Sequence, residues 1–142
     1  MINKLQLNTQ LYPADVVVAK KKKGFGRILN HYIVYVGDGI FIGNLKDGVK
    51  ILTDYELSDL LVDYEPIKIK PFVGNSLMRN AATNRAYSRI GQNYSLINFN
   101  CEHFANWVQK GTENSIQVTI AMSFLLLGLT YQLIKVNNGK RR

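Results

Sequence analysis

The sequence is poor in the residues that cross-link a chain or bind metals. It holds a single cysteine, Cys101, and two histidines, His31 and His103. One cysteine excludes an intramolecular disulfide and any zinc or iron–sulfur site built from several cysteines, and two histidines leave few ligands for a histidine-based metal site. We therefore expect a protein that uses no metal.

Internal repeats and low-complexity linkers are also lacking. Apolar residues make up 46% of the chain and charged residues 20%, which is ordinary for a globular protein. This balance argues against disorder, collagen-like repeats and coiled coil. With 142 residues, the chain has room for one domain around a single core.

Acidic residues are absent from the C-terminal part of the chain. The last acidic residue is Glu113. The charged residues beyond it are Lys135 and the basic residues 140–142, and their four positive charges equal half of the net charge of +8. A second basic block, residues 20–23, is expected to be a solvated loop or a contact to anionic lipid headgroups. Because no stripe of arginines and aromatic residues accompanies these blocks, nucleic acid is not an expected partner.

Charge is missing altogether from the nineteen residues 116–134. As a helix this run would span about 28 Å, close to the hydrocarbon thickness of a bilayer, and Tyr131 with the basic tail of residues 135–142 resembles an interfacial anchor. We expect a membrane anchor here. The alternatives are an apolar helix packed on the domain or buried in a dimer.

The N-terminal residues 1–11 are too polar for the apolar core of a signal peptide. Together with the lone free thiol, this predicts a membrane-associated protein whose globular part lies in a reducing, cytoplasmic compartment.

The hydrophobic pattern predicts strands first and helices later. Strands are expected at residues 15–19, 31–36, 40–42, 49–52 and 66–70, with Gly37-Asp38-Gly39 as the turn of a hairpin over residues 31–44. Helices are expected after the capping-box pair Thr53 and Glu56, over residues 76–90, and from residue 101 to 110. The predicted class is α+β: a small antiparallel β-sheet packed against helices, plus a C-terminal apolar helix.

Cys101 lies where a helix is predicted to begin, with Asn98 or Asn100 as its N-cap. Backbone N–H groups at a helix N-terminus stabilise a thiolate, so we expect a lowered thiol pKa and a nucleophile near neutral pH. His31, at the start of a predicted strand, is the candidate general base. The alternative is that both are structural, with Cys101 a small buried core residue.

Three segments resemble the lecithin–retinol acyltransferase (LRAT) family. NCEHFANWV at residues 100–108 resembles the nucleophile motif of that family, and HYIVYVGDG at residues 31–39 resembles its histidine strand. Residues 13–16 are similar to its opening Pro-Gly-Asp segment, with Ala14 in place of the glycine. The resemblance implies a permuted papain-like fold over residues 11–115, with Cys101 as nucleophile and His31 as general base.

One position departs from the resembled pattern. Many animal members carry a second histidine twelve residues after the first, and here that position is Gly43. The neighbouring Asn44 is a candidate to orient the His31 imidazole, as in a Cys-His-Asn arrangement. If Gly37 and Asp38 alone form the turn, Asn44 lies opposite His31; a three-residue loop turns Asn44 to the other face.

His103 belongs to the same motif as Cys101 but is expected to be structural. Two residues along a helix rotate a side chain by about 200°, so His103 should face away from Cys101.

The activity implied by the resemblance is that of a thiol acyltransferase or phospholipase. The Cys101 thiolate would attack a phospholipid ester and form a thioester, without a cofactor, and the partners would be the phospholipid membrane and an acyl-donor lipid. Two other functions remain: a cysteine peptidase or amidase of the NlpC type, in which the cysteine usually precedes the histidine, and a catalytically silent membrane-associated interaction module.

Overall fold

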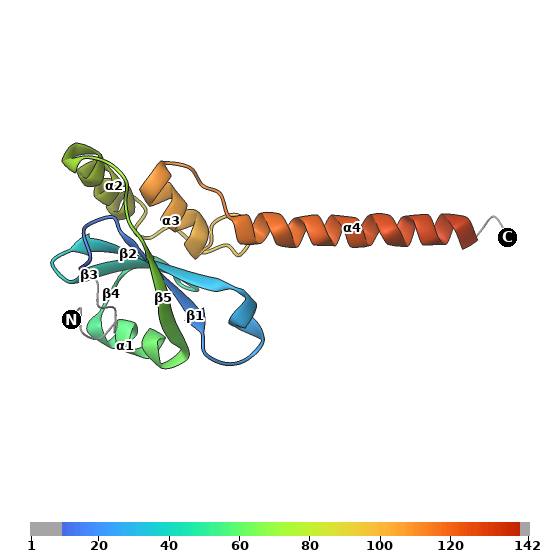
Figure 1. The fold of residues 1–142 in the computed structure, drawn as a ribbon, viewed down its shortest axis with the longest axis horizontal. Coiled ribbons are helices and arrows are strands. Elements are labelled where there is room, and N and C mark those ends of the chain that lie inside the picture. Colours follow the sequence, from blue (N-terminus) through green and yellow to red (C-terminus); the bar gives the residue numbers. More distant parts are fainter. Residues whose placement is uncertain (1–9, 140–142) are drawn as a thin grey trace.

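Five antiparallel strands form one sheet in the order β4-β3-β2-β1-β5, with helices on both faces (Figure 1). The computed structural model describes residues 10–139. The predicted α+β class, with its antiparallel sheet and C-terminal apolar helix, is confirmed. In chain order the elements are β1 (Val16–Lys21), the 3₁₀-helix η2 (Phe25–Ile28), β2 (Asn30–Gly37), β3 (Ile40–Leu45), β4 (Gly48–Leu52), α1 (Asp54–Asp63), β5 (Tyr64–Lys70), α2 (Ser76–Ser88), α3 (Cys101–Lys110) and α4 (Ile116–Gly139).

Alternate residues of the central strands β1 and β2 face two separate cores. Val16 and Tyr32 pack with residues of α2 and α3 on one face of the sheet. Val17 and Ile33 pack on the other face with Leu57 of α1. Since burying a valine side chain contributes about 1.5–3 kcal/mol of transfer free energy, the valines of β1 fix the strand that both cores share.

The hairpin of β2 and β3 contains a bulge next to its turn. Tyr35 pairs with Phe41 and Gly37 pairs with Ile40, so Val36 is an extra residue on the β2 side. Gly37 has a φ of +106°, a backbone conformation that glycine adopts at little cost. Sequence analysis left two registers open for this hairpin. The structure has the register expected for the three-residue loop, because the bulge shifts β3 by one residue relative to β2.

The basic residues 20–23 are not all in a loop, as the sequence predicted. β1 continues to Lys21, and Lys20 pairs with Asn30 of β2. Lys22 follows the strand, and its Nζ donates a hydrogen bond of 2.6 Å to the Leu61 carbonyl. The prediction of a solvated loop is wrong for Lys20 and Lys21 because pairing with β2 extends the strand past the apolar run.

Helix α4 projects away from the rest of the molecule (Figure 1). Its apolar stretch Ile116–Asn138 is long and apolar enough to cross a membrane, and none of that stretch is buried against the chain's own domain. The alternative of a helix packed along the domain is therefore wrong. Of the predicted basic tail, residues 140–142 lie outside the described residues.

Asp15 joins the N-terminal end of β1 to the segment before α2. Its carboxylate accepts hydrogen bonds from the backbone N–H groups of Tyr12 and Phe72 and forms an ion pair of 3.2 Å with Arg79. The preceding Ala14 has a φ of +70°, a left-handed conformation that suits the glycine of the resembled segment. Asp15 is buried, so these contacts replace its lost hydration.

We predict that Asp15→Ala lowers the free energy of unfolding by roughly 3 kcal/mol, because the buried Phe72 N–H and the part-buried Tyr12 N–H lose their acceptor and Arg79 loses its ion-pair partner. Asp47→Ala is the control, since Asp47 is an exposed carboxylate paired only with Lys50 at the surface, and should leave stability almost unchanged. Denaturant unfolding of the full chain in detergent, followed by Trp107 emission, measures both. Equal losses in the two variants would contradict the role of Asp15.

Candidate active site

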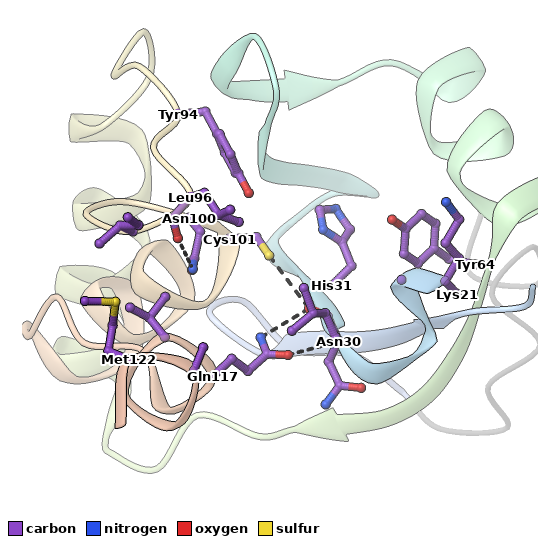
Figure 2. A pocket seen from close by; sticks show the side chains of 15 residues that line it. Lys21, Asn30, His31, Tyr64, Tyr94, Leu96, Asn100, Cys101, Gln117 and Met122 are labelled. Carbon is purple, nitrogen blue, oxygen red and sulfur yellow. Dashed lines mark hydrogen bonds between the residues drawn. The ribbon is translucent and has the colours of Figure 1, made fainter. Parts of the chain in front are cut away.

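A cavity of about 300 Å³ opens where three elements meet. The start of β2 contributes Asn30 and His31, the N-terminus of α3 contributes Cys101, and the first turns of α4 contribute Gln117 (Figure 2). The structure therefore brings both residues predicted for the chemistry, His31 and Cys101, to one cavity although 70 positions separate them in the chain.

Cys101 is the first residue of α3, and Asn100 is the N-cap of that helix. The Oδ1 of Asn100 accepts hydrogen bonds from the N–H groups of Glu102 and His103 at 2.9 and 3.1 Å. Of the two predicted caps, Asn100 is thus the one used. The cap fixes the first turn of α3 and with it the position of the thiol.

Burial raises the pKa of the Cys101 thiol to about 11. The pKa of the thiol is lowered by nearby backbone N–H groups, those of Tyr32, Cys101 and Glu102. Their effect is smaller than the increase in pKa caused by desolvation. The Sγ atom lies 4.0 Å from the carbonyl oxygen of Asn30, an acceptor that favours the protonated thiol. The sequence-based expectation of a lowered pKa is therefore corrected: the helix N-terminus is present, but the site is too dry for a free thiolate.

His31 is also held in its neutral form. Burial lowers the pKa of its imidazole to about 4. Its ring lies 5.4 Å from the ring of Tyr64, measured between centroids. Among the described residues, its Nε2 atom is buried without a hydrogen-bond partner. His31 therefore lines the cavity as a neutral imidazole.

Asn44 does not lie on the side of the sheet that the orienting role requires. The pair of Ile33 with Gly43, continued by one residue, places Asn44 beside Tyr32 and not beside His31. Asn44 is fully buried, and its Nδ2 donates a hydrogen bond of 2.7 Å to the carbonyl oxygen of Phe99. The contact ties β3 to the segment that precedes Cys101, so Asn44 supports the nucleophile's segment and not the imidazole.

Gly43 has the place of the second histidine of the resembled pattern. It pairs with Ile33, which lies two residues from His31 and so on the same face of β2. A Cβ atom at Gly43 would lie 3.4 Å from Leu52 and 3.5 Å from Ile33. A side chain at this position would therefore be in van der Waals contact with Leu52 and Ile33.

His103 has a structural position. Its Nδ1 accepts a hydrogen bond of 3.2 Å from the Asn100 N–H, which completes a capping box with the Asn100 side chain. This contact directs the His103 ring to the Asn100 backbone, in keeping with the expected structural role.

Sequence analysis missed the residues that attach α4 to the site. The buried carboxylate of Glu102 accepts hydrogen bonds from Ser115 Oγ at 2.5 Å and from the Gln117 N–H at 3.1 Å. The Gln117 side chain bonds both backbone groups of Asn30, accepting from its N–H at 2.7 Å and donating to its carbonyl at 3.4 Å. The signal in the sequence was weak, because Gln117 is one of several polar residues within the uncharged run 116–134.

The sequence model of the family described as lecithin retinol acyltransferase matches residues 60–114, a segment that includes Cys101 and ends just before α4. No curated protein matches the chain.

We predict slow alkylation of Cys101 at pH 7, with a rate that rises with pH toward a midpoint of about 11, because burial disfavours the thiolate. The control is the double variant Cys101→Ala/Val73→Cys, which moves the thiol to a highly exposed position. At pH 7 the control should react with iodoacetamide roughly two orders of magnitude faster than the native chain. A Cys101 that reacts as fast as the control would contradict the burial argument.

Proposed function

We propose that this chain, which matches the lecithin retinol acyltransferase family model over residues 60–114, is a thiol-dependent acyltransferase or phospholipase that cleaves phospholipid esters. The observation that supports the proposal is that Cys101, at the N-terminus of α3, and His31, at the start of β2, line one cavity. No cofactor takes part in the proposed reaction.

In the first half of the reaction, Cys101 Sγ attacks the ester carbonyl carbon of the lipid while His31 Nε2 takes the thiol proton. The tetrahedral intermediate collapses with cleavage of the carbon–oxygen bond. The lysophospholipid oxygen leaves with the proton from His31, and the acyl group stays on sulfur as a thioester. In the second half, water, an amine or an alcohol attacks the thioester and returns the proton to Cys101 through His31.

The neutral resting state of the two residues determines how the proton moves. A thiol pKa of about 11 and an imidazole pKa of about 4 make a preformed thiolate–imidazolium pair unfavourable at pH 7. The proton is therefore transferred as the sulfur attacks, when the carbonyl begins to accept negative charge. A lipid that fills the cavity keeps water away from the ester during the first half of the reaction.

The start of α3 supplies the donors for the developing oxyanion. The N–H groups of Glu102 and His103 are already bonded to Asn100 Oδ1. We assign the remaining N–H group of the first turn, that of Cys101, to the oxyanion. The cap thereby leaves the Cys101 N–H group without a bond to the Asn100 side chain.

Helix α4 fits a protein that works at a membrane. It is long and apolar enough to anchor the chain in a bilayer, and the cavity lies at its first turns. Lys21 lines the same cavity and is suited to contact an anionic phosphate of a lipid headgroup. In this arrangement the domain lies on the cytoplasmic surface of the membrane.

The silent-module alternative is favoured by one observation, the high pKa of the buried thiol. It differs from the proposed enzyme in one respect that can be measured, because a silent module forms no covalent bond with a lipid.

We predict a hydroxylamine-sensitive acyl mass on the intact full chain after incubation with phosphatidylcholine vesicles, because the thioester forms on Cys101. The adduct should be absent in Cys101→Ala and should form at least about 100-fold more slowly in His31→Gln, which removes the base. Trp107 emission checks that both variants keep the native fold. A native chain that stays unmodified and whose thiol also ignores electrophiles at every pH would favour the silent module.

A further inference from the structure

The first turns of α4 are fixed to the two residues that adjoin the proposed catalytic pair in the chain. Gln117 bonds the backbone of Asn30, the residue before His31. Ser115 and the Gln117 N–H bond the carboxylate of Glu102, the residue after Cys101. The helix that would enter the bilayer is therefore joined to the domain at the cavity itself.

The same turns form a wall of the cavity. Val118, Ala121 and Met122 line it, and their spacing places them on one face of α4. Leu96 and Ile97, in the loop before α3, line the cavity as well and are 60% and 55% exposed. The cavity is thus bordered by apolar side chains of α4 and of this loop, and part of that surface is open.

We propose that this apolar wall binds the acyl chain of a bilayer phospholipid, with Ala121 at the position that limits how much chain fits. The proposal rests on the proposed function, since it places the chain of the same lipid ester. The occupant follows from continuity, because the exposed side chains of Leu125 and Leu129 continue the face of Val118 and Met122 along α4. An acyl chain of a bilayer that surrounds α4 would then follow one apolar face of the helix to the cavity.

Ala121 is the smallest side chain among the three α4 residues of the wall. A bulky residue there would occupy space that a long acyl chain needs, whereas a short chain would still reach the sulfur. Ile120 is the adjacent residue, is 51% exposed and lies outside the cavity lining described above. Ala121→Phe and Ile120→Phe therefore introduce the same ring on two sides of one helix turn.

The first experiment measures chain-length selection by the full chain in mixed vesicles that contain equal amounts of phosphatidylcholines with 10-carbon and 18-carbon chains. Intact mass reports which acyl group is on Cys101. We expect Ala121→Phe to shift the ratio of the adducts toward the short chain by roughly tenfold or more, and Ile120→Phe to leave it unchanged. A native-like ratio in Ala121→Phe would overturn the inference and leave the proposed function standing.

The second experiment does not depend on catalysis and uses Cys101→Ala protein in vesicles that contain a phosphatidylcholine with a photoreactive acyl chain. Cross-links are expected on Leu96 or Ile97 as well as on Met122, and Ala121→Phe should reduce the loop cross-links while Ile120→Phe does not. Cross-links confined to α4 beyond residue 122 would overturn the inference. An unacylated native chain with loop cross-links would refute the proposed chemistry and retain the binding surface.

Discussion

The contact of the α3 N-terminus with the start of β2 is the interaction on which the site depends. It places the Cys101 thiol against the Asn30 carbonyl, and burial lowers the pKa of the His31 imidazole to about 4. Desolvation then outweighs the backbone N–H groups around the sulfur, so that both residues are neutral at rest. The reactivity of the site therefore depends on the substrate that binds in the cavity, because the sulfur carries no negative charge before binding.

Helix α4 is attached to the domain at the same place, where the N-terminus of α3 meets the start of β2. Glu102 and Asn30, which adjoin Cys101 and His31, are also the partners of the first turn of α4. Any displacement of α4 at its base thus acts on the neighbours of both residues. A helix that is long and apolar enough to cross a membrane, joined in this way, would bring the cavity and a bilayer together, which a flexible linker would not do.

Sequence reasoning located the elements well because their signals are local. The capping box of Thr53 and Glu56 and the Asn100 cap are confirmed, since each depends on residues a few positions apart. The place of Asn44 depended on a bulge at Gly37 that shifts the register by one residue. The thiol pKa and the role of Gln117 could not be predicted, because burial and contacts across 87 positions arise only in the folded chain.

The most direct test of this account is the titration of the His31 ring by NMR in the native full chain and in Cys101→Ala. A neutral pair predicts that the ring gains its proton only near pH 4, and at nearly the same pH in the variant, because an uncharged thiol hardly affects the imidazole. A ring that is charged at pH 7 in the native chain and neutral in Cys101→Ala would contradict it, since only a thiolate–imidazolium pair gives that result.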